Sequence, residues 1–408
     1  MEVNKEVLLI IGGGEEQIPA YEIARSSGYL TVGTDMNVSA PASKYADYFL
    51  KASTRDIQET LDAVLSFNKK IKIDGVMTIA NDVPLTVAKV ADKLRLRSIS
   101  IESAEISSNK LQMKEKFIEF GVPCPNYYEI SDINTFKKIV KNTSNKFILK
   151  PIDGCGARGV LLFSAKDNLE MVYNQSKSYT DSKVLLLEEF IDGLQISSES
   201  FLINGNAYTA ALSERNYSRL NEFLPNIIED GGTIPAPVNK TQFSKINSII
   251  ELAAKSIGVR DGIIKGDIVI DKDSNIKIIE IATRLSGGWF CSHQIPEATG
   301  INLVQANIDF AMGKKIDPLS IIPTKDISTS IRYFFIQEGR IHDIRGESMI
   351  KNAPGLIKYD FYKNVGDYQN KVLKHSDRFG YVICKGRNRD ESISNVQNAI
   401  KMIEVILN

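Results

Sequence analysis

The sequence predicts a multidomain protein that combines an α/β domain with α+β regions. Its 408 residues suffice for roughly two to three domains with apolar cores. The first hundred residues alternate apolar runs with amphipathic segments, which is typical of an α/β unit, whereas the chain after residue 315 reads mainly as short strands. We therefore expect domains at residues 1–105, 106–314 and 315–408, the last one small and β-rich.

The first region should be a Rossmann-like parallel sheet, because its apolar runs are continuous rather than alternating. The expected strands and helices are Val7–Ile11, Gln17–Ser27, Leu30–Thr34, Ile57–Phe67, Gly75–Ile79 and Val83–Leu94. Gly12–Gly14 and Asp35 allow a dinucleotide-dependent dehydrogenase as one hypothesis, since an acidic residue about 20 positions after the glycines can hold a ribose. Gln17 stands where that fingerprint has its third glycine.

A glycine-rich turn between two apolar strands, FILKPIDGCGARGVLLF, marks the middle region. Gly154, Gly156 and Gly159 would allow backbone N–H groups to approach phosphate oxygens closely. Lys150, at the end of the first strand, would add a positive charge at the same phosphates. An ordinary hairpin with a flexible turn is the alternative interpretation of this segment taken alone.

Further elements are expected on both sides of this turn. They are a helix at Ser107–Phe120, a hairpin formed by Ile196–Ile203 and Ala207–Leu212, and helices at Thr241–Ile257, Leu303–Ala311 and Ile393–Leu407. Strands Gly266–Ile270 and Asn275–Ile281 flank a tight turn and can bring Asp267 and Glu280 to one spot. Two carboxylates without a fixed basic neighbour repel each other unless a cation lies between them, and Mg²⁺ suits such a pair. Two solvated acids at strand ends are the alternative.

The net charge, the cysteine spacing and the lengths of the apolar segments indicate which partners and which cell compartment to expect. Fifty basic and fifty acidic residues cancel, so we expect neither a nucleic-acid nor a membrane partner. The four cysteines have no paired spacing, which argues against a disulfide framework or a zinc site and favours a reducing compartment. No segment approaches the roughly 20 apolar residues that span a bilayer. We expect a cytoplasmic protein.

Motifs along most of the chain resemble the ATP-grasp superfamily, particularly its biotin-carboxylase-type and carboxylate–amine ligase branches. In order they are VLLIIGGGEEQ, SNKLQMKEKFIEFGVPCPNY, FILKPIDGCGARGV, LLEEFIDGLQISSES, GDIVIDKDSNIKIIEIATRLSGG and the closing segment from PGLIKYDF. The resemblance implies an ATP-grasp fold in which a lid subdomain, about residues 115–187, closes over ATP.

At the phosphates, the resemblance implies that Lys110 and Lys150 contact the α- and β-phosphates. Backbone of Gly154–Gly159 would cover the β- and γ-phosphates, and Asp267 and Glu280 would hold Mg²⁺, for which Mn²⁺ is expected to substitute. Ala282 stands where many members have a further metal ligand, which leaves the number of Mg²⁺ ions open.

At the base and the acceptor, the resemblance implies that Glu188 accepts from the adenine amino group and Ile191 presents a backbone N–H. Phe190 would wall the ring and Gln195 would face the ribose hydroxyls. Arg284 would act with Lys150 in catalysis, facing the acyl-phosphate and the substrate carboxylate.

The implied reaction is ADP-forming ligation of a small-molecule carboxylate to an amine. The carboxylate would attack the γ-phosphate of ATP, and the amine would then displace phosphate from the acyl-phosphate to form an amide or peptide bond. An ATP-dependent carboxylase that acts through carboxyphosphate and a non-catalytic nucleotide-binding module are the alternatives. The resemblance also suggests a homodimer.

Overall fold

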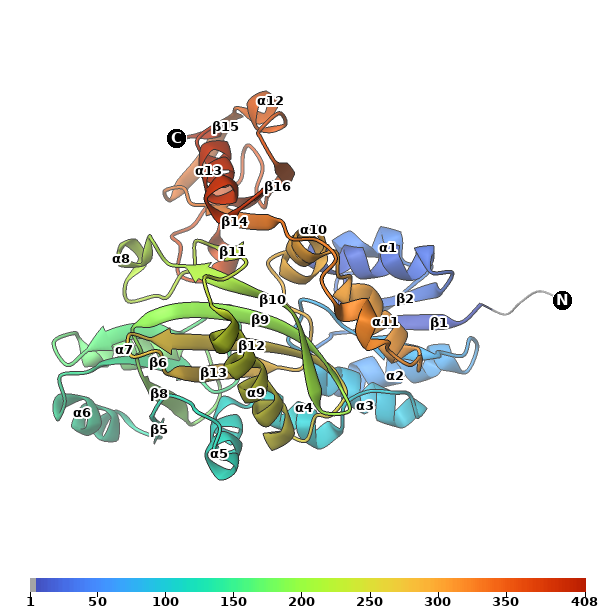
Figure 1. Ribbon diagram of the computed structural model, residues 1–408, viewed down its shortest axis with the longest axis horizontal. Helices are drawn as coiled ribbons and strands as arrows, with labels where there is room; N and C mark the ends of the chain where they lie inside the picture. Colours follow the sequence, from blue (N-terminus) through green and yellow to red (C-terminus); the bar gives the residue numbers. More distant parts are fainter. Residues whose placement is uncertain (1–4) are drawn as a thin grey trace.

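The computed structural model describes residues 5–408, so the first four residues of the expected N-terminal domain lie outside the described chain. Four sheets make up the described chain, and Figure 1 shows them as a blue N-terminal unit, a central green and yellow sheet, a teal unit below it and an orange-red C-terminal part. Within residues 5–408 no helix is long and apolar enough to cross a membrane.

The N-terminal sheet is parallel, as predicted, with the strand order β3-β2-β1-β4. Its elements are β1 (Val7–Ile11), α1 (Ile18–Ser26), β2 (Leu30–Asp35), β3 (Tyr48–Lys51), α2 (Ile57–Asn68), β4 (Gly75–Met77) and α3 (Pro84–Leu94). All five residues of β1 are buried because helices pack on both faces of the sheet. The sequence prediction had omitted the short edge strand β3.

The glycine turn after β1 is filled by the protein's own side chains. The carboxylate of Asp35 accepts a hydrogen bond of 3.2 Å from the Gly13 amide and another from Asn37. A Cβ atom added at Gly13 would lie 2.8 Å from both Ala40 and Phe49. Asp35 therefore serves as a strand-end cap, and this packing gives no support to the dinucleotide hypothesis.

The helix expected at Ser107–Phe120 is wrong in its start, because two helices meet at Asn109. They are α4 (Ile101–Ser108) and α5 (Lys110–Phe120). Asn109 is extended and its side chain accepts from the amides of Leu111 and Gln112, which makes it the N-cap of α5. Lys110 therefore occupies the first position of a new helix, where its side chain points out of the helix start.

The teal unit of Figure 1 is an antiparallel sheet of order β5-β8-β6-β7, with two helices packed against it. Its elements are β5 (Tyr127–Ile130), α6 (Ile133–Lys141), β6 (Lys146–Pro151), β7 (Leu161–Ser164), α7 (Leu169–Lys177) and β8 (Leu185–Glu189). β6 pairs with β7, so the glycine-rich segment is the loop of a hairpin, as the sequence indicates. Phe136, Phe147 and Phe163 form the centre of its core.

The central sheet has eight strands in the order β13-β12-β9-β10-β11-β14-β18-β16. Its strands are β9 (Gly193–Ile203), β10 (Asn206–Asn216), β11 (Gly231–Ile234), β12 (Gly262–Asp271), β13 (Ile276–Ala282), β14 (Ser328–Phe334), β16 (Leu356–Phe361) and β18 (Gly380–Gly386). Helices α8 (Leu220–Phe223), α9 (Lys240–Ser256), α10 (Ile295–Thr299) and α11 (Leu303–Ala311) belong to its connections. Because β11 pairs with β14, the sheet is continuous across the domain boundary expected near residue 315, and that boundary stays a prediction.

The C-terminal part adds a three-stranded sheet of order β17-β15-β19. Its elements are β15 (Gly339–Arg345), α12 (Glu347–Ile350), β17 (Tyr368–Gln369), α13 (Arg389–Ile400) and β19 (Glu404–Leu407). The expected final helix at Ile393–Leu407 is therefore wrong in its second half. Glu404–Leu407 pairs with β15 and places Val405 and Leu407 against a core that includes Ile341.

Candidate active site

A cavity of about 1180 Å³ lies between the N-terminal unit, the teal unit, the central sheet and the C-terminal part. All but one of the predicted site residues line it. Those that do are Lys110, Lys150, Gly154, Gly156, Glu188, Phe190, Ile191, Gln195, Asp267, Glu280 and Arg284. The structure therefore brings together residues from five separate segments of the sequence.

Gly159 is the predicted residue that does not line the cavity. Its φ of +67° favours glycine, and a Cβ atom there would lie 3.0 Å from the Tyr179 ring, so it serves close packing. Gly156 also has a positive φ, +64°, but has nothing within 4 Å of an added Cβ. The open part of the loop is thus Gly154–Ala157, which lies along the cavity.

A buried carboxylate between two lysines forms the inner wall. Glu188 on β8 is 2% exposed, and its oxygens lie 2.7 Å from Lys150 Nζ and 3.0 Å from Lys114 Nζ. Burial alone would raise the pKa of Glu188, but the two ammonium groups lower it to about 2. The expected contact of Glu188 with adenine stays a prediction, since its carboxylate oxygens here face the two lysines.

Lys114 was not predicted, although one signal was available. It lies four residues after Lys110 on α5, so both lysines lie on one face of that helix. Lys110 Nζ donates to the carbonyl of Gly154 at 2.6 Å and lies 3.8 Å from Glu280. α5 thus supplies one cation to the glycine loop and another to the buried Glu188.

The two predicted metal-binding carboxylates face each other across the β12–β13 hairpin, where Asp267 pairs in register with Glu280. The expectation that they have no basic neighbour is wrong. Asp267 forms ion pairs with Lys265 and with Arg215 Nη1, the latter at 3.1 Å. Burial opposes ionisation of both acids, but Lys265 lowers the pKa of Asp267 and Lys110 lowers that of Glu280. Both carboxylates are therefore charged at neutral pH.

This donor set fits Mg²⁺ bound together with a nucleotide. Among residues 5–408 no cluster of three or more His, Cys, Asp or Glu side chains could enclose a metal ion by itself. Mg²⁺ is commonly held by one or two carboxylates plus substrate phosphates, and Asp267 and Glu280 supply the two carboxylates.

The loop after β13 carries Arg284, which bonds to the N-terminal unit. Arg284 Nε donates to Asp82 Oδ1 at 2.7 Å, and a second guanidinium nitrogen contacts the same oxygen. The backbone amide of Ala80 donates to the Leu285 carbonyl at 3.0 Å. Asp82 follows β4 and was not predicted, because nothing in its local sequence marks it as a partner of a residue 202 positions away.

Two more acids that the sequence did not indicate hold the same loop. Glu199 on β9 is fully buried and accepts from the Ser286 amide at 2.9 Å and from the Ser286 hydroxyl. Burial raises the pKa of Glu199 to about 7. Glu16 accepts from the Gly288 amide at 2.7 Å, and burial raises its pKa as well. The loop is therefore fixed from the sheet and from the N-terminal unit.

The C-terminal part also lines the cavity, through residues that the sequence analysis missed. The backbone amide of His375 donates to the Gly156 carbonyl at 3.2 Å and so touches the glycine loop. Arg378 donates to the Glu229 carbonyl at 2.6 Å, and its guanidinium carbon lies 3.6 Å from the centre of the Tyr333 ring. Tyr333 and Arg378 both line the cavity. The sequence alone could not predict that Tyr333, Arg378 and Glu229 lie together, because they are far apart along the chain.

Three further side chains, His293, Trp289 and Arg215, are held by contacts with other residues of the protein. His293 is half-buried, lies beside Ser292 and is edge-on to Trp289, and burial lowers its pKa to about 4. Trp289 is 2% exposed and packs against Tyr381, whereas its neighbour Phe290 lines the cavity. Arg215 is in a buried ion pair with Glu229 at 2.7 Å, in addition to its contact with Asp267.

Two family descriptions match the chain. Residues 107–288 match the ATP-grasp domain, and residues 332–408 match the L-amino acid ligase C-terminal domain 2. Residues 107–288 therefore form an ATP-grasp domain, and enzymes with this domain use ATP and Mg²⁺. The chain is an ATP-grasp ligase, with a C-terminal domain of the kind found in L-amino acid ligases.

Individual relatives are distant. An L-arginine-specific L-amino acid ligase from Bacillus subtilis is 21% identical over 340 residues, 80% of this chain and 78% of that protein. Alanine–anticapsin ligase from Bacillus subtilis is 20% identical over 287 residues, which span 64% of this chain and 58% of that ligase. The crystal structure of an L-amino acid ligase from Bacillus licheniformis is 20% identical, covers 99% of both chains and superposes with a TM-score of 0.84. The shared fold thus extends over the whole chain.

Proposed function

We propose that the protein is an ADP-forming carboxylate–amine ligase that joins an amino acid or similar small acid to an amine through an acyl-phosphate. The observation that supports this most is the composition of one cavity. It combines the lysines Lys110 and Lys150, the carboxylates Asp267 and Glu280, and Arg284. This set suits phosphoryl transfer to a carboxylate, which needs positioning and charge neutralisation rather than a nucleophile on the protein.

The first step would take place beside the glycine loop. ATP would lie with its base at the hinge formed by Phe190 and Ile191 and its phosphates under Gly154–Ala157. Lys110 and Lys150 would turn from the carboxylates they now contact toward the phosphates. Mg²⁺ held by Asp267 and Glu280, or Mn²⁺ in its place, would neutralise charge on the phosphates. The substrate carboxylate would then attack the γ-phosphate, forming a C–O–P linkage and releasing ADP.

The second step would take place on the side of the cavity where Arg284 lies. Arg284 would hold the acyl-phosphate, with its position set by Asp82 and by the loop contacts of Glu16 and Glu199. The amine nitrogen would attack the acyl carbon, the C–O bond to phosphate would break, and the nitrogen would lose a proton as the amide forms. Phosphate is a good leaving group, so this step needs orientation more than acid–base assistance.

The test is release of ADP and phosphate with Mg-ATP, measured across a matrix of amino acids, small carboxylic acids, amines and bicarbonate. Turnover that requires both an acid and an amine would support the ligase and identify its substrates. Turnover with bicarbonate and no amine would replace it with the carboxylase. ATP binding without turnover under any condition would favour a non-catalytic nucleotide-binding module.

Variants connect this activity to the cavity. Glu280→Gln removes one proposed Mg²⁺ ligand and should lower ADP release by at least about 100-fold. Asp273→Asn is the matched control, because Asp273 is an exposed acid in the turn of the same hairpin. Unchanged turnover in Glu280→Gln would overturn the metal-site assignment.

Gel filtration with light scattering would test the proposed homodimer separately.

A further inference from the structure

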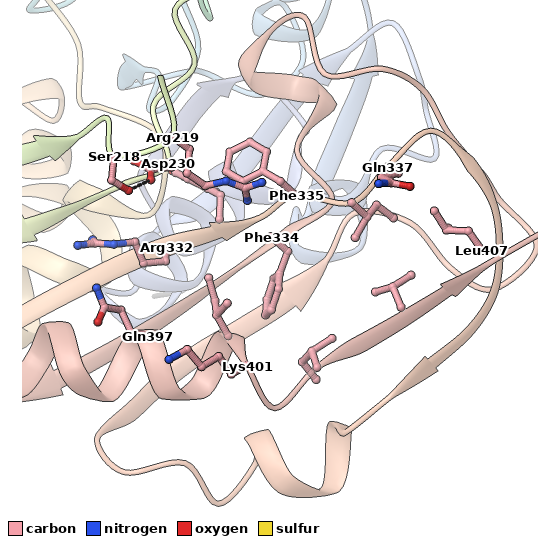
Figure 2. Close-up of a pocket in the computed structure, with 15 residues that line it drawn as sticks. Ser218, Arg219, Asp230, Arg332, Phe334, Phe335, Gln337, Gln397, Lys401 and Leu407 are labelled. Atoms are coloured by element: carbon pink, nitrogen blue, oxygen red, sulfur yellow. Dashed lines mark hydrogen bonds between the residues drawn. The ribbon is translucent and has the colours of Figure 1, made fainter. Parts of the chain in front are cut away.

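A second cavity of about 840 Å³ lies on the other side of β14 from the active-site cavity. Figure 2 shows it between the β10–β11 connection, which carries Ser218, Arg219 and Asp230, and the C-terminal elements that carry Gln397, Lys401 and Leu407. Nothing in the proposed reaction uses these residues. The cavity is large enough for a ligand of drug-like size.

One end of this cavity is positively charged. Arg332 is 9% exposed and has no ion-pair partner among residues 5–408; its Nη1 donates to the carbonyls of Ile331 at 2.8 Å and Gly232 at 3.2 Å. Lys401 is exposed and likewise has no ion pair in the described chain. A buried arginine whose hydrogen bonds reach only neutral carbonyls is stabilised when an anion binds it directly.

The nearest acid of the lining, Asp230, offsets only part of that charge. Asp230 acts on Arg332 without forming an ion pair with it, and its two oxygens accept from Asn216 at 2.7 Å and from Ser218 at 2.6 Å. Arg219, also in the lining, is paired with Glu222, which lies outside it. Because Arg332 and Lys401 stand against the single charge of Asp230, the lining keeps a positive excess at the end where Figure 2 places Arg332 and Lys401.

The rest of the lining is mainly apolar. Besides Tyr333 and Gln337, the second of which lies near Leu407 in Figure 2, it consists of Phe334, Phe335, Ile336, Ile400, Ile403, Val405 and Leu407. In Figure 2, Leu407 lies at the opposite end of the cavity from Arg332, with Phe334 between them. A ligand that fills this space would need an anionic head and an apolar chain.

We propose that this second cavity binds an amphipathic carboxylate, with its head group at Arg332 and its apolar chain against Phe334 and Leu407. The site is distinct from the active-site cavity. It adds a binding function that the ligase reaction does not require.

The two cavities share the strand β14 as a wall, so a ligand in the second cavity can affect residues of the active-site cavity. Along β14, Ile331 lines the active-site cavity, Arg332 lines the second cavity, and Tyr333 touches both. Tyr333 also donates its amide to the Asp230 carbonyl at 3.1 Å. A ligand bound at Arg332 would therefore also contact Tyr333, whose ring stacks with Arg378 in the active-site cavity. We expect occupancy of the second cavity to change the affinity for Mg-ATP or the acceptor.

The experiment measures binding of octanoate to the full chain by calorimetry in the absence of ATP, so its result does not depend on the ligase proposal. We expect saturable binding, with octylamine and acetate at least about 10-fold weaker because each lacks one half of the required chemistry. Arg332→Met should weaken octanoate binding by about 10-fold or more. Arg340→Met, an exposed arginine of the same part of the chain, should leave it unchanged.

A second variant provides an independent test in case Arg332→Met does not fold. Leu407→Trp fills the apolar end, leaves Arg332 in place and should also weaken octanoate binding. Arg284→Gln should not, because Arg284 belongs to the active-site cavity. Absence of octanoate binding to the natural protein, equal binding of octylamine, weakening by Arg284→Gln, or binding that survives both cavity variants would each overturn the proposal. A dimer whose formation abolishes binding would instead assign the cavity to a second copy of the chain.

Discussion

The two ends of the active-site cavity are built in different ways. At the end that we propose for the ATP phosphates, called here the phosphate end, Glu188 lies between Lys114 and Lys150 in a buried ion-pair cluster made by α5 and the neighbouring strands β6 and β8. At the end that we propose for the acyl-phosphate and the amine, called here the acceptor end, Arg284 and its loop are held by acids from distant segments, among them Asp82. The phosphate end is thus a compact buried cluster of two cations and one carboxylate. The acceptor end, in contrast, exists only when several parts of the chain are assembled.

The largest effect is expected from breaking the buried cluster. Lys150→Met should abolish ADP formation and also lower the free energy of unfolding by about 1.5–3 kcal/mol, because Glu188 would lose one of its two charged partners and keep Lys114. Urea unfolding followed by circular dichroism measures the second effect. The loss of activity in this variant is therefore not by itself proof of a catalytic role.

A double variant separates the two effects. Lys150→Met combined with Glu188→Met leaves Lys114 as the unpaired charge, so its stability should not return to that of the natural protein. Adding Lys114→Met removes the whole cluster, and stability should recover while ADP formation stays absent. Recovery of ADP formation in the triple variant would contradict a role for Lys150 at the phosphates.

The contrast between the two ends also explains what the sequence could predict. Lys150, Gly154 and Gly156 lie within one hairpin, and Asp267 and Glu280 lie within another, so short-range patterns were sufficient to place them. Such patterns indicate which residue types lie near each other in a strand–turn–strand unit, and the structure gathers all of them at one cavity.

Contacts between distant segments had no such signal. Glu199 and Ser286 are 87 positions apart, and Glu16 and Gly288 are 272 apart, so only the assembled fold shows that they meet. The neighbours of Asp267 were missed for a related reason. Lys265 lies on the same strand two residues away and was readable as sharing its face, but Arg215 comes from β10, whose place in the sheet the sequence did not define.

A pH-dependent effect of intermediate size is expected at the acceptor end. Burial raises the pKa of Glu199 to about 7, above its usual 4.5, so the folded chain keeps a proton that the unfolded chain releases. This contribution is complete below pH 4.5 and is lost as pH rises through 7, which lowers the free energy of unfolding by about 3 kcal/mol. Glu199→Gln should remove that part of the slope between pH 5 and pH 8 in urea titrations. Glu105→Gln, at an exposed position, should keep it.

A smaller effect is expected from the residue that positions Arg284. Asp82→Asn keeps the shape of the side chain but removes the charge that holds the guanidinium. We expect kcat/KM for the acid substrate to fall about 10- to 100-fold, which corresponds to about 1.4–2.7 kcal/mol, while the affinity for Mg-ATP stays unchanged. An equal loss of Mg-ATP affinity would show that the two ends are not independent. Asp92→Asn, in an exposed part of α3, is the matched control.

The smallest effect should come from an ion pair that lies close to the phosphate end but outside its buried cluster. Lys116 and Glu119 on α5 are 2.7 Å apart, with 37% and 58% of their side chains exposed. Water and salt screen such a pair, and holding two long side chains in one geometry costs entropy. Lys116→Ala should therefore shift the melting temperature by less than about 2 °C, whereas Lys114→Ala, two residues away on the buried face of α5, should shift it by several times as much. Equal shifts in the two variants would mean that burial of the cluster does not distinguish the phosphate end from the surface of the same helix.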